Sequence, residues 1–123
     1  MRDRFDLTVA VRSVPWRDWR TLGGGEPSAA VRARVIHARA RQADRQGLLN
    51  ARLSGAALKR ECALAADAER LLALGARQMT LSARGATRVI RVARTIADLR
   101  HRAQIAADDI AEALQFRASD SRE

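Results

Sequence analysis

The segment from Leu81 to Leu99, LSARGATRVIRVARTIADL, constrains the fold of this chain more than any other. At about 100° per residue its apolar side chains form one broad stripe along a helix. The stripe comprises Val89, Val92, Ala93, Ile96, Ala97 and Leu99, with Ile90 at its edge. Ser82 stands just before it, in a position suited to an N-cap. Such a stripe has to be buried against the apolar faces of other helices, so the pattern predicts a helical bundle.

Four further helices are expected in the rest of the chain. Ser28 is a suitable N-cap for a helix that ends near Gln46, and Gly47 is a suitable stop for it. The remaining helices are expected at about 54–62, 67–79 and 107–116. Asp108 and Asp109 suit the positive N-terminal end of the last helix. The predicted fold is therefore mainly α, a bundle of about five helices.

The first residues follow a different pattern. Leu7, Val9 and Val11 alternate with more polar neighbours, which predicts a β-strand that Pro15 ends. A lone strand leaves its backbone groups unpaired, so we expect it to belong to a sheet that is incomplete in this chain. Trp16 and Trp19 follow, and we favour packing over base stacking as their role.

The chain is thus divided into four parts. They are the end of a strand-containing core (1–14), a glycine-rich linker (15–27), a helical domain (28–117) and a polar tail expected to be disordered (118–123).

Composition narrows the classes of function. The chain has 23 basic and 14 acidic residues, a net charge of +9, which favours polyanionic partners such as nucleic acid or nucleotide phosphates. The single cysteine, Cys62, excludes an internal disulfide and is interpreted as a buried structural thiol. His37 and His101 lack ligands at a familiar spacing, so no metal site is expected. No signal peptide or membrane span is predicted, and the expected location is the cytoplasm.

Arginines occupy the side of the 81–99 helix opposite the apolar stripe. Arg84, Arg88 and Arg91 fall together, Arg94 lies at their margin, and Asp98 is placed to form an exposed i,i+4 pair with Arg94. A solvated surface, a nucleic-acid contact and a phosphate site are all compatible with this pattern. Arg84 favours the last of these. Arg84 stands in the first turn of the helix, where the helix end is itself positively charged. A cation is unfavourable there unless an anion binds between the guanidinium and the helix end.

Several segments, in order, resemble the C-terminal region of magnesium-chelatase-like AAA+ ATPases of the ComM/YifB type. They are RDRFDLTVAV, GEPSAAVRARV, ARQADRQGLLNARLS, LSARGATRVIRVARTIADL and IAEALQFR. The resemblance covers almost the whole chain, and the 81–99 block is its most specific part. Ala86 and Thr87 replace the aromatic residue and histidine usual in the family, and Phe116 replaces a tyrosine.

The resemblance implies a helical lid attached to an ATPase core. Arg4, in DRFD, matches the arginine finger that reaches a neighbouring subunit's nucleotide, and Arg84, in LSARG, matches the sensor-2 arginine that contacts phosphates in its own subunit. Relatives form hexameric rings that bind ATP and Mg, and the ComM branch is associated with DNA branch migration in natural transformation. This sequence has no G-x-x-x-x-G-K-[ST] P-loop, so the chain alone is expected to be no enzyme and to bind no cofactor.

Three hypotheses follow from these observations. The first is a lid and sensor-2 portion that senses nucleotide and contacts other subunits, with the core missing or on a separate chain. The second is a small basic nucleic-acid-binding module that uses Arg88 and Arg91. The third is a non-functional truncated fragment.

Overall fold

The structure, a computed structural model, describes residues 5–11, 13–19 and 25–118. Its elements in chain order are α1 (Trp16–Trp19), α2 (Ser28–Gln46), the 3-10 turn η2 (Asn50–Arg52), α3 (Gly55–Glu61), α4 (Ala66–Gln78), α5 (Ala83–Leu99) and α6 (Ala107–Ala118). These residues contain no sheet, and a single parallel bridge joins Leu64 to Ile105. The prediction of a mainly α fold is confirmed, and each predicted helix is found within one or two residues of its expected bounds.

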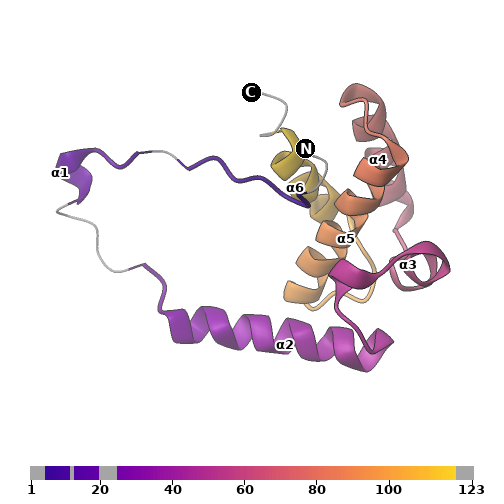
Figure 1. Ribbon diagram of the computed structural model, residues 1–123, viewed down its shortest axis with the longest axis horizontal. Helices are drawn as coiled ribbons and strands as arrows, with labels where there is room; N and C mark the ends of the chain where they lie inside the picture. The colour runs from indigo at the N-terminus through magenta and orange to yellow at the C-terminus, as the bar shows by residue number, and fades with distance from the viewer. Residues whose placement is uncertain (1–4, 12, 20–24, 119–123) are drawn as a thin grey trace.

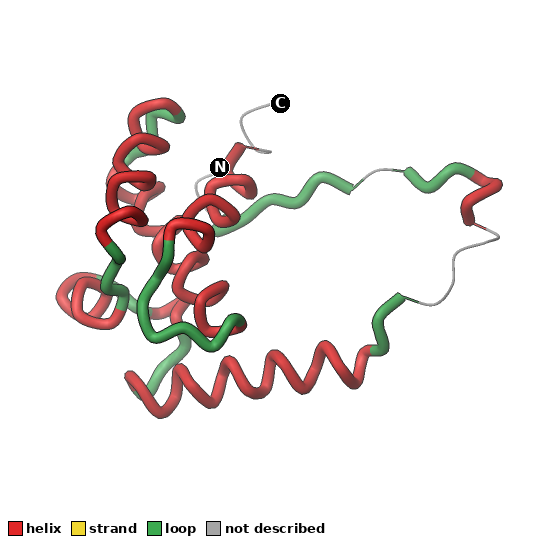
Figure 2. The backbone as a smooth tube through the Cα atoms, turned by 180° about the vertical axis from the view of Figure 1, so that it is seen from behind, coloured by secondary structure: helices red, strands yellow, loops and turns green. Residues whose placement is uncertain are grey.

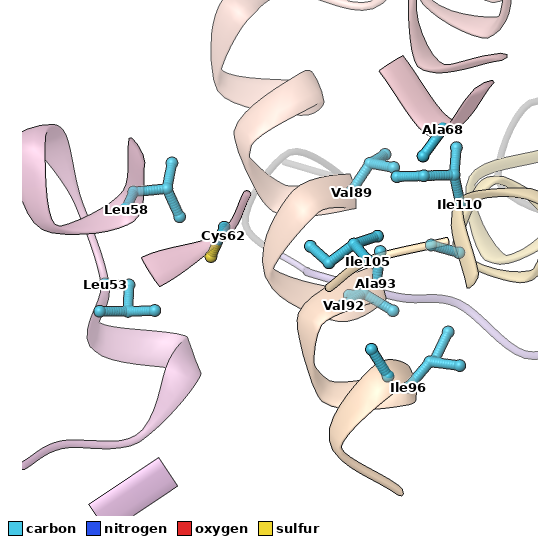
Figure 3. Packing of buried hydrophobic residues seen from close by; sticks show 12 residues of the cluster. Leu53, Leu58, Cys62, Ala68, Val89, Val92, Ala93, Ile96, Ile105 and Ile110 are labelled. Carbon is cyan, nitrogen blue, oxygen red and sulfur yellow. The ribbon is translucent and has the colours of Figure 1, made fainter. Parts of the chain in front are cut away.

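Helix α5 lies at the centre of the bundle. It packs against α6, which also packs against α4, while α2 lies across the C-terminal half of α5 (Figure 1). Figure 3 shows the core gathered around α5, with Leu53, Leu58 and Cys62 on one side and Ala68 and Ile110 on the other. The predicted stripe is buried as expected except for Leu99, which is 39% exposed and lies beside a groove.

The helix ends test the predicted caps. Ser82 is an N-cap as predicted, since its Oγ accepts a hydrogen bond from the Gly85 N–H at 3.0 Å. Gly47 ends α2 with φ 77°, a left-handed conformation that glycine adopts without strain. The prediction for Ser28 is wrong. Pro27 holds the cap position, and its carbonyl accepts from the N–H groups of Ala30 and Val31, so Ser28 is already helical.

The predicted strand is not formed in the described part of the chain. Residues 5–11 run from beside α6 towards α1, away from the bundle (Figures 1 and 2). Phe5 is 62% and Val11 88% exposed, and no described residue pairs with this segment in a ladder. Without a neighbouring strand the alternating pattern has nothing to pair with. Trp16 is 70% exposed, and the side chain of Trp19 lies outside the described part of the structure, so the role predicted for the two tryptophans stays a prediction.

A buried polar network joins α2 to α5. Asp98, fully buried, accepts hydrogen bonds from Arg45 Nη1 at 2.7 Å and Arg45 Nη2 at 3.1 Å, and from Asn50 Nδ2 at 2.8 Å. Arg94 Nη2 lies 3.2 Å from the same carboxylate. The Asn50 N–H donates to Gln42 Oε1 at 2.9 Å, so the end of α2 and η2 are fixed against α5 by polar contacts.

This network corrects the prediction for Arg94 and Asp98. Both were expected at the surface as an exposed pair, yet their side chains are 1% and 0% exposed. Arg94 also donates to the carbonyls of Ala103 at 2.9 Å and Arg102 at 2.7 Å. Burial lowers the pKa of Arg94 from its usual value, and Asp98 opposes that shift by favouring the charged form.

The cysteine and the histidines behave as structural residues. Cys62 is buried in the core as predicted, and its burial raises the pKa of the thiol to about 11. The rings of His37 and His101 meet edge to face with centroids 4.8 Å apart. Within the residues that the structure describes, no group of three or more His, Cys, Asp or Glu side chains is arranged to hold a metal ion. A search of the same residues finds no helix that could span a membrane.

Candidate anion-binding site at the start of helix α5

The start of α5 carries a positive charge that no described residue neutralises locally. A helix start leaves four backbone N–H groups unpaired, and the Ser82 cap satisfies one of them, that of Gly85. The first turn of α5 contains no acidic residue. By contrast, Asp67 and Glu69 stand in the first turn of α4, and Asp108 and Asp109 in that of α6. In α6 the Asp109 carboxylate also accepts from the Ala106 N–H at 2.9 Å, whereas α5, like α2 and α3, has no acidic residue in its first turn.

Arg84 is the side chain that distinguishes this end. It lies in the first turn of α5, is exposed, and makes no hydrogen bond or ion pair with any residue the structure describes. A guanidinium at the positive end of a helix is unfavourable by a few tenths of a kcal/mol up to about 1 kcal/mol unless an anion is close. Backbone N–H groups and a fork of guanidinium N–H groups together suit a phosphate oxygen. The arrangement therefore fits an anion such as a phosphate group.

The other arginines of the predicted face are held by the protein itself. The side chain of Arg88 is 12% exposed, with its Nε 3.9 Å from Asp6 Oδ1. Arg91 Nη1 donates to the Leu53 carbonyl at 2.9 Å, which ties α5 to the residue after η2. Of the four arginines on this helix only Arg84 is exposed, so the side of α5 opposite the stripe is not a solvated basic surface.

A groove lies between α5 and α6. It encloses about 480 Å³ and is mostly apolar. Its lining includes Leu7, Val92, Ile96, Leu99 and Phe116, with charged side chains such as Arg91, Arg100 and Glu112 around them. Leu7 and its neighbour Asp6 thus bring the N-terminal segment against α5. Arg4, the predicted arginine finger, lies outside the described residues.

Sequence reasoning missed the Asp98 network. Its one local signal was the position of Arg94 at the edge of the apolar stripe, where a long side chain can turn inward. Arg45 and Asp98 are 53 residues apart, so nothing in the helical pattern of either segment indicated that they meet.

Comparison with known proteins agrees with this architecture. Residues 25–117 match the family described as "Magnesium chelatase, subunit ChlI C-terminal". Competence protein ComM of Haemophilus influenzae is 38% identical over 117 residues, covering 94% of this chain and 23% of the relative. An uncharacterized protein, YifB, of Salmonella typhimurium is 40% identical over 119 residues, covering 96% of this chain and 24% of its own length.

A more distant relative extends the same relationship. An uncharacterized protein of Mycobacterium tuberculosis is 35% identical over 124 residues, covering 98% of this chain and 24% of that protein. The chain thus spans about a quarter of the length of the curated relatives it matches. From its matched residues and its helical bundle, the chain belongs to the family of magnesium chelatase ChlI C-terminal domains, and it corresponds to the C-terminal region of proteins of the ComM/YifB type.

Proposed function

We propose that this chain is the helical lid of a magnesium-chelatase-like ATPase and that Arg84 contacts the phosphates of the bound nucleotide. The observation that supports the proposal most is the exposed Arg84 guanidinium, without a partner among the described residues, beside the capped start of α5. A phosphate at that position accepts hydrogen bonds both from the remaining N–H groups of the helix start and from the guanidinium. Arg4, by its place in DRFD, is proposed to reach the nucleotide of a neighbouring subunit and to stabilise charge on the transferred phosphoryl group.

ATP and Mg are proposed to bind mainly through a core that this chain does not supply. One arginine and one helix end provide a small part of a nucleotide site, so the chain alone should neither bind ATP tightly nor hydrolyse it. The assembly proposed for the complete ATPase is a homohexameric ring in the cytoplasm that acts on DNA. Competence protein ComM is the relative whose name is consistent with a role in natural transformation.

A chimera tests the role of Arg84. The matched C-terminal region of Haemophilus influenzae ComM is replaced by this chain, and the rate of ATP turnover is measured. Arg84→Ala should lower kcat/KM for ATP by roughly 10- to 100-fold, the effect of losing one hydrogen bond to a charged group. Arg77→Ala is the matched control, because Arg77 is an exposed arginine in the last turn of α4.

Two results would contradict the proposal. Equal turnover by the Arg84→Ala and Arg77→Ala chimeras would show that Arg84 does not belong to the nucleotide site. Turnover of ATP by the purified 123-residue chain would show that the chain is an enzyme in its own right, against the proposed role as a lid.

A second candidate function is nucleic-acid binding, and α2 now favours it more than α5 does. Arg32 and Arg39 are exposed on α2 and form no ion pair with the described residues, whereas Arg88 and Arg91 are held against the bundle. Exposed cations bind phosphate backbones without sequence preference, and salt weakens that binding. In a gel-retardation series at increasing salt, Arg32→Ala plus Arg39→Ala should weaken DNA binding more than Arg88→Ala plus Arg91→Ala. An absence of retardation at low salt would eliminate this function.

A further inference from the structure

One face of α2 is only partly covered by the bundle. At about 100° per residue, Val31, Val35, Ala38 and Gln42 fall on the same side of this helix. Ala38 and Gln42 are buried where α2 packs on α5, whereas Val31 and Val35 are 39% and 43% exposed. The side of α2 that packs on the bundle therefore continues past the edge of the bundle, and the described residues leave that continuation uncovered (Figure 1).

A second groove lies where this face meets the bundle. It encloses about 220 Å³ between α2, η2 and the C-terminal end of α5, and its walls are mostly apolar. Val35, Leu49 and Leu99 are among its lining residues, and Arg39 is the one charged side chain that the described residues contribute to it. The groove thus offers an apolar floor with a cation at its edge.

The flank of this face is basic and has no counter-charge nearby. Arg32 and Arg39 stand seven residues apart, about two turns of helix, and both are exposed without an ion pair among the described residues. Asp44, the single acidic residue in the sequence of α2, falls about 220° around the helix from Val31. Glu26, just before the helix, is already paired with Arg34. The uncovered face therefore combines an apolar strip with two unpaired arginines.

The outer half of α2 has little to hold it in a helical conformation. Every residue from 28 to 37 is exposed. Isolated helices shorter than about 12–15 residues are only marginally stable in water, and most helical stability comes from packing of an amphipathic face. A partner that covers this face would therefore also stabilise the outer half of α2.

We propose that this face of α2 is a docking surface for an acidic amphipathic helix of a partner protein. The apolar side chains of that helix fill the groove at Val35, Leu49 and Leu99, and its carboxylates pair with Arg32 and Arg39. A helix suits the surface because the side chains of one helix pack between those of another. An apolar centre with arginine beside it is also typical of protein interfaces.

The apolar floor distinguishes this partner from a nucleic acid. A DNA duplex pairs its phosphates with the same two arginines, but its backbone has no apolar side chains to place against Val35 and Leu99. The inference is independent of the proposed nucleotide contact, since Arg84 stands at the start of α5 and Leu99 at its end.

Two fluorescent peptides of identical composition, rich in Glu and Leu, test the proposal. In one peptide the leucines recur at alternating spacings of three and four residues and form a helical face, and in the other their order is scrambled. Fluorescence anisotropy with the 123-residue chain should show at least about tenfold tighter binding of the amphipathic peptide, which corresponds to burial of roughly one leucine side chain. Arg84→Ala should leave this binding unchanged.

A change in the groove tests its apolar floor. Val35→Asp should weaken binding of the amphipathic peptide more than about tenfold, because it places a carboxylate in an apolar groove and opposite an acidic peptide. Leu74→Asp is the matched control, since Leu74 is a similarly exposed apolar residue on α4, at 46%. This control should bind the peptide as the unaltered chain does.

A pair of double variants tests the charges. Arg32→Ala plus Arg39→Ala should weaken binding about fivefold, the effect of losing two exposed ion pairs. Arg70→Ala plus Arg77→Ala removes two exposed arginines with the same seven-residue spacing from α4, so it lowers the net charge equally. The α4 variant should bind the peptide with nearly unchanged affinity. In hydrogen exchange, the bound peptide should slow the amides from 31 to 37.

Four results would overturn the proposal. Equal affinity for the two peptides, or unchanged affinity in Val35→Asp, would show that the apolar floor takes no part. Equal weakening by the α2 and α4 double variants would reduce the effect to net charge. Retardation of a DNA duplex that depends on Arg32 and Arg39 but not on Val35, without preference between the peptides, would assign the face to nucleic acid. Sedimentation of the chain alone as a dimer that Val35→Asp dissociates would assign it to a second copy.

Discussion

Replacement of Asp98 by asparagine should strongly destabilise the bundle. The substitution keeps the shape of the side chain and removes its charge. Asp98 is fully buried and accepts three hydrogen bonds, two from Arg45 and one from Asn50, with Arg94 at 3.2 Å. In the Asp98→Asn variant both guanidinium groups lose their counter-charge, and an amide N–H₂ faces donors that need an acceptor.

The expected loss can be estimated from these contacts. Each hydrogen bond to a charged group contributes about 1.5–3 kcal/mol, but bonds that share one carboxylate are not additive. Arg45 recovers some hydration because its side chain is 22% exposed, whereas Arg94, at 1%, cannot. Removing one member of a buried pair costs about 3–5 kcal/mol. We expect a loss in this range, which is a large fraction of the roughly 5–15 kcal/mol that stabilises a typical domain.

Urea denaturation followed by circular dichroism at 222 nm measures this loss, since the fold is mainly helical. Asp44→Asn is the matched control, an exposed aspartate of α2 whose change should stay within about 0.5 kcal/mol. A double-mutant cycle with Arg45→Met should give a coupling energy of about 1–3 kcal/mol. A loss below about 1 kcal/mol for Asp98→Asn, or additive single changes, would refute the view that this carboxylate fixes α2 to α5.

Three further predictions concern the helix cap, the thiol and the extent of the domain. Ser82→Ala should lower the free energy of unfolding by about 1 kcal/mol in urea melts, because the Gly85 N–H loses its acceptor; Ser54→Ala, whose hydroxyl makes no cap bond, is the control. The pKa of Cys62 is raised to about 11, so its contribution to stability is intact below pH 9 and is lost as the pH rises towards 11; melts at pH 8 to 11 should show a decline that Cys62→Ala lacks. Limited proteolysis should leave a core from about residue 26 to 117, and early cleavage inside α5 or α6 would show that the bundle does not fold alone.

Most of the fold could be predicted from the sequence because local rules govern it. The 3.6-residue period of the 81–99 segment gave α5 its bounds, and Ser82 and Gly47 act at the helix ends as their residue types favour. The strand at Leu7, Val9 and Val11 could not be verified by pattern alone, because a strand forms only with a partner and none is present among the described residues.

The candidate site was predictable only where its environment is local. Arg84 depends on the cap and the first turn of its own helix, and it is exposed there as the pattern suggested. Arg88, Arg91 and Arg94 depend on Asp6, on the Leu53 carbonyl and on the α5–α6 loop, which a helical wheel does not include. Long side chains near the edge of an apolar stripe can turn inward, so their exposure is decided by tertiary contacts.

The two ends of α5 have different tasks, and their separation makes the proposed function testable without confusion with stability. At about 1.5 Å per residue, Asp98 lies about 21 Å along the axis from Arg84. The C-terminal half holds α2 and the α5–α6 loop through buried charges, whereas the N-terminal end presents an exposed cation. Changes at Arg84 should therefore alter the response to nucleotide while leaving the urea midpoint nearly unchanged. Changes at Asp98 should lower the urea midpoint. In the molecules that remain folded, the start of α5 should stay intact. A loss of stability in Arg84→Ala comparable to that in Asp98→Asn would mean that Arg84 is part of the packing, and its assignment to a phosphate would have to be abandoned.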